Sequence, residues 1–224
     1  MKHYTLIFLL FLAAAAFPQT AAQTVESAAA WQNYYTGRSF ESQSRMEDAM
    51  PYYNEAVRIS LDEIGRSISA ESSYVVLTWT LQRQRRYAEV ISWGEQGLSM
   101  NAGNYRLLEV MGEAYFYLDD YDRSLRCMQQ YSGAVSQGDR LSTAYFFIGE
   151  IFRLRGKFLH ADIAYTTAVQ IEPNVPLWWY RLGLVRESLK EYPLAAEAYE
   201  RALRINPAYQ EAQAGLGRAR QQRN

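Results

Sequence analysis

The feature that most constrains this chain is an internal repeat, because residues 142–175 and 176–209 are adjoining blocks with a period of about 34 residues. The two blocks carry matching residue types at matching positions, which are Ile148 and Leu182, Gly149 and Gly183, Phe158 and Tyr192, Ala161 and Ala195, Tyr165 and Tyr199, Ala168 and Ala202, Ile171 and Ile205, and Pro173 and Pro207. A period of this length indicates helical or mixed units that stack side by side, because one unit cannot bury its apolar face alone.

The residue types at these positions favour two antiparallel helices in each block. Gly149 and Gly183 remove a side chain from the first helix, so the second helix can approach it closely. The alanines do the same from the second helix at no cost in helix propensity, and the aromatic residues fill the space left open. Pro173 and Pro207 cannot continue a helix, so each ends its block and turns the chain into the next unit.

The pattern Trp179-x-x-Leu182-Gly183…Ala195-x-x-x-Tyr199…Pro207 resembles the tetratricopeptide repeat family. The resemblance implies an all-α fold, a right-handed superhelical α-solenoid of helix-turn-helix repeats. The alternative is an ordinary helical bundle with accidental self-similarity, and the agreement at many positions in adjoining blocks argues against it. The family is defined by architecture, so the resemblance does not by itself give a biological role.

The repeat can be traced backwards through three weaker blocks, so that the predicted array occupies residues 23–209. These blocks are residues 30–63, 71–104 and 105–138, with insertions between units at 64–70 and 139–141. Junctions between units are where a solenoid tolerates insertions.

Two local patterns in the second block lead to further expectations. Gly94 and Gly97 lie in its second helix, where alanine or an aromatic residue is usual, so we expect that helix to be the least stable of the array. The cluster Arg83, Arg85 and Arg86 falls between the two helices of this block, and we interpret it as a solvated bend.

Residues 210–224 begin like another first helix and then become basic. Ala212 and Leu216 continue the apolar face, and Arg218, Arg220 and Arg223 follow near the helix C-terminus, where the macrodipole favours positive charge. One apolar and one charged face predict a C-terminal capping helix that closes the array. A nucleic-acid role for these arginines is disfavoured, because the chain as a whole has a net charge of −1.

Residues 1–22 have the layout of a secretory signal peptide. Lys2 gives a positive start, residues 4–16 form an apolar run, and residues 17–22 are rich in small side chains. We expect cleavage after Ala22, with Ala16 and Gln23 as alternative sites. An uncleaved anchor is the other interpretation, but the run is shorter than the roughly 20 residues that span a bilayer. The prediction is export to the bacterial periplasm or cell envelope, without a membrane span after cleavage.

The sequence offers few groups for catalysis or metal binding. Outside the expected leader, His160 is the only histidine and Cys127 the only cysteine, so a zinc site or an internal disulfide is not expected. We interpret them as a surface imidazole and a packed thiol. Loops that cradle phosphate and nucleophile elbows are absent from the sequence. Glu113 and Glu150 occupy equivalent places on neighbouring units but nothing else supports a catalytic pair, so the prediction is a non-enzyme without a cofactor.

In the tetratricopeptide family the first helices line a concave groove, and the resemblance assigns facing positions in this chain. Besides Val75, the implied groove residues that we expect to bind a partner are Trp79, Arg106, Glu109, Glu113, Phe116, Tyr117, Phe146, Glu150, Arg153 and Tyr180. Family members that grip acidic tails of cytosolic chaperones use a lysine, asparagine and arginine clamp. Its asparagine positions carry other residues here, namely Arg38, Trp79, Glu113 and Glu150.

The leading hypothesis is therefore an exported, non-enzymatic scaffold that holds a protein or peptide in its concave groove. A second hypothesis is a periplasmic pocket for a small apolar ligand in a solute-uptake or lipid-handling system. A third is self-association through the end units of the array. Tyrosine and arginine suit a binding groove because they bury area and also donate hydrogen bonds.

Overall fold

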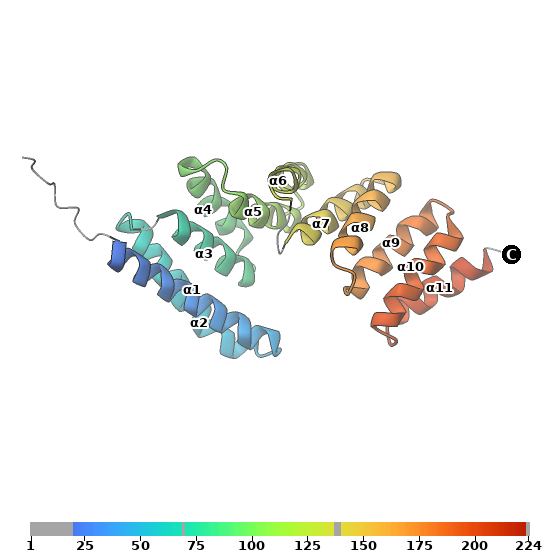
Figure 1. The fold of residues 1–224 in the computed structure, drawn as a ribbon, viewed down its shortest axis with the longest axis horizontal. Coiled ribbons are helices and arrows are strands. Elements are labelled where there is room, and N and C mark those ends of the chain that lie inside the picture. Colours follow the sequence, from blue (N-terminus) through green and yellow to red (C-terminus); the bar gives the residue numbers. More distant parts are fainter. Residues whose placement is uncertain (1–19, 69, 137–139, 223–224) are drawn as a thin grey trace, which may run out of the picture.

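The computed structural model describes residues 20–68, 70–136 and 140–222, and in these ranges the regular structure consists of α-helices without strands. Figure 1 shows them following one another along the long axis of the molecule. The helices are α1 (Thr20–Ser42), α2 (Met46–Gly65), α3 (Ala70–Arg83), α4 (Tyr87–Met100), α5 (Tyr105–Tyr117), α6 (Tyr121–Ala134), α7 (Leu141–Leu154), α8 (Phe158–Ile171), α9 (Pro176–Ser188), α10 (Tyr192–Ile205) and α11 (Gln210–Gln221).

The helices pack as successive pairs that form an all-α solenoid. Within each pair the two helices are joined by a short turn, and each second helix also packs on the first helix of the next pair. First helices contact one another as well, because α1 packs on α3, α3 on α5, α5 on α7, and α9 on α11. The odd-numbered helices therefore form one continuous face of the molecule, and the even-numbered helices form the other.

The helix pairs can be placed on the predicted units. One pair lies in each expected repeat, although α1 and α2 extend beyond both ends of residues 30–63. The expected leader lies mostly outside the described residues, because only positions 20–22 are described, as the beginning of α1. Within the described residues, no helix combines the length and apolar character needed to cross a membrane.

The turns inside the five pairs share one backbone geometry. Each has a residue with φ between 58° and 69° at the same place in the repeat, and these residues are Ser44, Arg85, Asp119, Gly156 and Lys190. The amide that follows each of them donates to a carbonyl five residues earlier, as Arg86 does to Leu81 at 3.0 Å. This is the Schellman ending of a helix, in which a left-handed residue usually is glycine. Only Gly156 follows that preference, so the sequence does not mark the other four turns.

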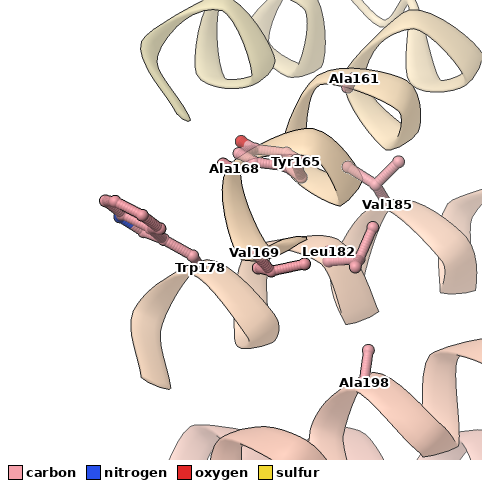
Figure 2. Packing of buried hydrophobic residues seen from close by; sticks show 8 residues of the cluster. All are labelled: Ala161, Tyr165, Ala168, Val169, Trp178, Leu182, Val185 and Ala198. Atoms are coloured by element: carbon pink, nitrogen blue, oxygen red, sulfur yellow. The ribbon is translucent and has the colours of Figure 1, made fainter. Parts of the chain in front are cut away.

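Glycines of first helices contact aromatic rings of second helices. An added Cβ on Gly183 would lie 2.5 Å from Cε1 of Tyr199, and one on Gly149 would lie 2.7 Å from the Tyr165 ring. Figure 2 shows how this packing continues into the next unit, where Tyr165 and Val169 of α8 lie near Leu182 of α9. The core is thus continuous along the array, as stacking units require.

In the second pair, glycines lie in the second helix and side chains of neighbouring helices fill the space beside them. Gly94 of α4 faces Met111 of α5, and a Cβ on Gly94 would lie 2.5 Å from the Met111 sulfur. Gly97 similarly receives Leu107 and the Cβ of Tyr74. The two glycines therefore make room for neighbouring side chains, and α4 is a continuous helix of 14 residues. Its expected low stability stays a prediction.

Because the two glycines meet different side chains, the same substitution should lower stability by different amounts at Gly183 and at Gly94. Gly183→Ala should lower the free energy of unfolding by about 1–3 kcal/mol, because the added methyl meets a rigid, fully buried ring. Gly94→Ala should cost less, because the unbranched side chain of Met111 can change rotamer more easily than a ring, although its sulfur and Cγ would lie 2.5 and 2.6 Å from the added Cβ. Urea denaturation followed by circular dichroism checks both. Equal losses at the two positions would contradict this account of the packing.

Candidate partner-binding groove

A cavity of about 750 Å³ opens on the odd-numbered helix face in the N-terminal half of the array. We call it the N-terminal cavity. Helices α1, α3 and α5 supply most of its lining, and the end of α6 and the start of α7 supply the remainder. The lining residues are Trp31, Tyr34, Tyr35, Arg38, Trp79, Tyr105, Arg106, Glu109, Tyr131, Val135 and Arg140.

Aromatic side chains of α1 and α3 form one wall of this cavity. Trp31 lies at the centre, stacked on Tyr35 with ring centroids 5.5 Å apart and edge-on to Trp79 at 5.6 Å. The Trp31 indole is held in place because its Nε1 donates to Ser72 Oγ at 3.1 Å. Tyr35 is 59% exposed, so its ring is available to a ligand. Trp31 and Tyr35 are four residues apart on α1, which places their side chains on the same face of that helix.

A buried pair of carboxylates lies behind the floor of the cavity. Glu109 and Glu113 are one turn apart on α5, and their side chains are only 3% and 8% exposed. Arg140, which precedes α7, forms ion pairs with both and donates from Nε to Glu109 at 2.7 Å. Gln82 of α3 also donates to Glu113 at 2.8 Å. Burial raises the pKa of Glu109 above its ordinary value, although the nearby Arg140 opposes the shift.

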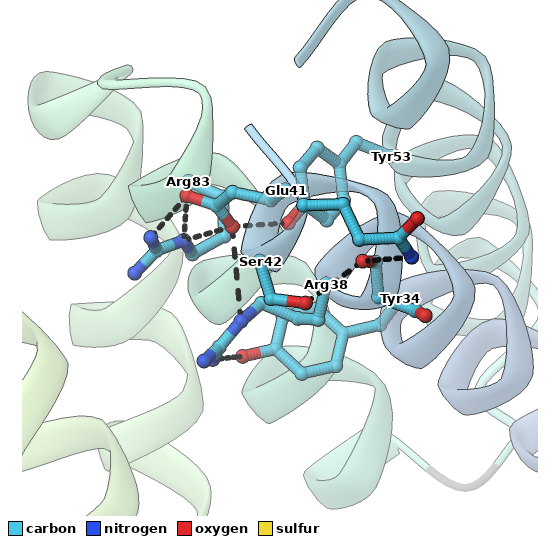
Figure 3. A network of polar contacts seen from close by, with 8 residues as sticks. Tyr34, Arg38, Glu41, Ser42, Tyr53 and Arg83 are labelled. Carbon is cyan, nitrogen blue, oxygen red and sulfur yellow. Dashed lines mark hydrogen bonds and ion pairs between the residues drawn. The ribbon is translucent and has the colours of Figure 1, made fainter. Parts of the chain in front are cut away.

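Arg83 corrects part of the expectation for the basic cluster between α3 and α4. Its guanidinium is half-buried and forms an ion pair with Glu41 of α1, whose side chain also accepts a hydrogen bond from Tyr53 at 2.6 Å (Figure 3). Burial acts to raise the pKa of Glu41, but the hydrogen bonds from Arg83 and Tyr53 hold it below its ordinary value. The solvated interpretation was therefore wrong for Arg83, which links the first two helix pairs.

The same combination of carboxylate, tyrosine and arginine recurs in the C-terminal half. Glu150 accepts hydrogen bonds from Tyr165 and from Arg153, the latter at 2.8 Å, and its Oε1 lies 3.1 Å from Arg181 of the next unit. Glu187 accepts from Tyr199 at 2.7 Å and from Arg218 of α11 at 2.7 Å. Glu150 and Arg153, both predicted groove residues, are thus engaged in bonds inside the protein.

The predicted aromatic groove residues outside the cavity pack mainly against other rings of the chain. Phe146 stacks on Trp178 with centroids 5.5 Å apart, and Phe116 lies edge-on to Phe147 at 5.0 Å. Tyr180 packs against Tyr199 and Tyr209. Tyr117 is 51% exposed but stacks on Tyr87 at 4.8 Å. Of the predicted set, the residues that line the N-terminal cavity are Trp79, Arg106 and Glu109.

Several cavity residues were missing from the predicted groove set, namely Trp31, Tyr34, Tyr35, Arg38, Tyr105, Tyr131, Val135 and Arg140. The aromatic residues of α1 could have been found, because three of them within one and a half turns form a helical stripe in the sequence. Arg140 carries no such signal, since it lies in an insertion and only the tertiary structure brings it to Glu109.

The groups considered for catalysis or metal binding have different environments and separate partners. Cys127 is buried, which raises the pKa of its thiol to about 11, and His160 is exposed beside Phe152. Glu113 is bound by Arg140 and Gln82, whereas Glu150 has its own arginine and tyrosine partners. Among the described residues there is no cluster of side chains suited to hold a metal ion.

Comparison with known proteins identifies the repeat. Residues 176–209, which coincide with the last predicted block and with α9 and α10, match the family model for the tetratricopeptide repeat. The helix pairs of the remaining array have the same architecture. The chain carries a tetratricopeptide repeat and has the fold of a tetratricopeptide solenoid.

Solved structures show the same fold at low sequence identity. The crystal structure of MamA superposes with a TM-score of 0.61 at 20% identity, covering 68% of this chain and 82% of MamA. That of YrrB, described as a tetratricopeptide repeat protein with an unusual peptide-binding site, gives a TM-score of 0.56 at 20% identity, covering 89% of this chain and 98% of YrrB.

A curated relative is similar over a longer stretch of sequence. The human protein O-mannosyl-transferase TMTC3 is 27% identical over 185 residues, which are 80% of this chain. The match spans only 20% of that relative. The transferase name therefore describes a much larger protein, and the likeness to this chain is confined to a small part of it.

Proposed function

We propose that this tetratricopeptide repeat protein is a non-enzymatic scaffold that binds a segment of a partner polypeptide in the N-terminal cavity. The observation that carries the proposal is the cavity itself, with about 750 Å³ of space beside an exposed aromatic ring and an exposed arginine. Tyrosine, tryptophan and arginine are the residue types that dominate the energetics of protein interfaces. The description of YrrB as a peptide-binding member of the same fold supports this assignment.

The C-terminal half of the odd-numbered face contributes less to this site. Its carboxylates are engaged by tyrosine and arginine, and its predicted aromatic residues pack on neighbouring rings. A ligand could engage the carboxylates only if these hydrogen bonds were broken. We therefore place the contact region mainly on α1, α3 and α5.

The test uses exposed tyrosines as a matched pair. Peptides selected on the wild-type protein from a random twelve-residue display library should bind the Tyr35→Ala variant about 10- to 30-fold more weakly, as expected for loss of an interface anchor. Tyr117→Ala removes a ring that is 51% exposed and lies outside the cavity, and it should leave the Kd within about twofold. Fluorescence anisotropy measures both. Unchanged affinity for Tyr35→Ala, or an equal loss for Tyr117→Ala, would remove the cavity from the proposal.

A small apolar ligand is the second candidate, because the cavity volume also falls in the range of about 300–1,000 Å³ typical of small-molecule sites. Native mass spectrometry of the full chain purified from its source separates the two candidates. A retained small molecule that is lost from the Tyr35→Ala variant would favour this candidate. Peptide binding by a protein free of such a ligand would favour the scaffold.

We further propose export to the bacterial cell envelope, which rests on the charged start, apolar run and small residues of positions 1–22. Expression with a C-terminal tag, cell fractionation and N-terminal sequencing test this proposal. The expected product is found in the envelope fraction and begins at Gln23. A full-length product in the cytoplasm would overturn it.

A further inference from the structure

We infer that the polypeptide segment held in the N-terminal cavity carries an acidic side chain next to an apolar or aromatic one, and that Arg106 binds the carboxylate. This inference rests on the proposed function and adds the chemistry of the partner. It follows from a comparison of the charged groups that line the cavity and from what each of them already binds.

Three arginines line the cavity, and they differ in their partners. Arg140 is committed to the buried Glu109 and Glu113. Arg38 donates to Tyr34 Oη at 3.1 Å and lies 3.7 Å from Glu41. Arg106 is exposed and has no hydrogen bond or ion pair among the described residues. It is therefore the cation that a ligand can engage without displacing another group.

Carboxylates near the cavity do not cancel this charge. Glu109, the acidic residue in the lining, is almost fully buried and already paired with Arg140. A hollow of about 600 Å³ shares Tyr105 and Arg106 with the cavity, and there Glu71 accepts hydrogen bonds from Asn101 and Asn104 at 2.8 and 2.9 Å. Glu113, which shares Arg140 with Glu109, and Glu41, which lies 3.7 Å from Arg38, offset the other two lining arginines. Arg106 is therefore the lining cation that no carboxylate pairs among the described residues. The electrostatic complement is an anionic group.

The aromatic wall determines what lies beside that anion. Rings such as Trp31 and Tyr35 could also attract a cation through their faces. A cationic ligand is disfavoured here, because it would approach Arg106, whose charge no carboxylate pairs among the described residues. Apolar and aromatic side chains gain from burial against the rings without that repulsion. An acidic residue with an apolar neighbour satisfies both parts of the cavity.

Charge reversal tests the inference. The display selection is run on the wild type, on Arg106→Glu and on Arg126→Glu. Arg126 is the control because it is exposed, has no ion pair or hydrogen bond with the residues that the structure describes, and lies outside the cavity on α6. Wild-type and Arg126→Glu selections should be enriched in Asp or Glu beside apolar residues. The Arg106→Glu selection should lose these peptides and become enriched in Lys or Arg.

Comparing a selected acidic peptide with its Asp→Asn or Glu→Gln version then measures how much the peptide charge contributes to affinity. Removing the peptide charge should weaken binding to the wild type about 10- to 100-fold and should hardly affect binding to Arg106→Glu, and the difference should shrink as salt is added. Enrichment of neutral or basic peptides on the wild type, with binding still lost in Tyr35→Ala, would overturn this inference and leave the proposed function intact. Failure to enrich any peptide would overturn both.

Discussion

Replacing Tyr165 with alanine is expected to lower the free energy of unfolding by about 3–5 kcal/mol, the range found when a large aromatic side chain is removed from a core. Tyr165 is fully buried, and its ring fills the space above Gly149. The glycine has no side chain that could expand into the vacated volume. The change also removes the hydroxyl that donates to the buried Glu150. Urea denaturation followed by circular dichroism measures the loss.

Two variants separate packing from hydrogen bonding in this result. Tyr165→Phe keeps the ring and removes only the hydrogen bond to Glu150, so we expect the free energy of unfolding to fall by about 1–3 kcal/mol. Tyr35→Ala removes an exposed ring of the same type and should change stability by about 0.5 kcal/mol or less. If Tyr165→Ala were no more destabilising than Tyr35→Ala, the pairing of glycine with tyrosine would not hold the units together.

Replacing Arg140 with alanine is the second change with a large expected effect, a loss of about 3–5 kcal/mol at neutral pH. The substitution leaves Glu109 and Glu113 buried without their cation, and removing one member of a buried ion pair costs more than the pair contributes. The double substitution Arg140→Ala with Glu109→Gln should recover part of the loss, because it also removes one uncompensated charge. No recovery would show that Arg140 acts through packing of the chain before α7.

The pH dependence of the Arg140→Ala variant has a defined sign. The pKa of Glu109 in the folded protein is raised by burial, so above its unfolded value the folded protein binds more protons than the unfolded chain. Stability therefore falls as the pH rises through that window. Without Arg140 the pKa should rise further, and acidification from about pH 7 to about pH 5 should recover stability more in the variant than in the wild type.

Other carboxylates set the lowest pH at which this experiment can be interpreted. The pKa values of Glu41 and Glu187 are held below the ordinary value of 4.5 by their arginine and tyrosine partners. Their contribution is present above that value and is lost as the pH falls through their folded pKa values. Measurements above about pH 5 therefore report mainly on the buried carboxylates that lose Arg140. A variant whose deficit is the same at both pH values would contradict the assignment of the buried charge.

The fold could be predicted from the sequence because the residue types that define each helix pair recur at fixed spacings along the chain. The contacts of Gly149 with Tyr165 and of Gly183 with Tyr199 determine which faces of the paired helices meet. The second pair shows the limit of such reasoning, because Gly94 replaces the expected aromatic residue and Met111 fills the space from the next unit. A pattern read one unit at a time does not contain that compensation.

The site was only partly accessible from the sequence. The resemblance placed Trp79, Arg106 and Glu109 among the groove residues, and these three line the N-terminal cavity. It gave equal weight to Phe146, Glu150 and Tyr180, which pack against neighbours in the structure. A facing position in a repeat gives the direction of a side chain. It does not tell whether a neighbouring ring or charge already covers that side chain.

By itself, the sequence determined the all-α helical repeat, because helix periodicity, proline stops and glycine–aromatic pairs act over neighbouring residues. Only the tertiary structure decided which charges are available. Arg140 pairs with Glu109 from a distant part of the sequence, whereas Arg106, three positions before Glu109, has no partner in the described part of the chain. The physical reason is that desolvation and ion pairing depend on distances in space between units, and these distances are not encoded at any fixed spacing along the chain.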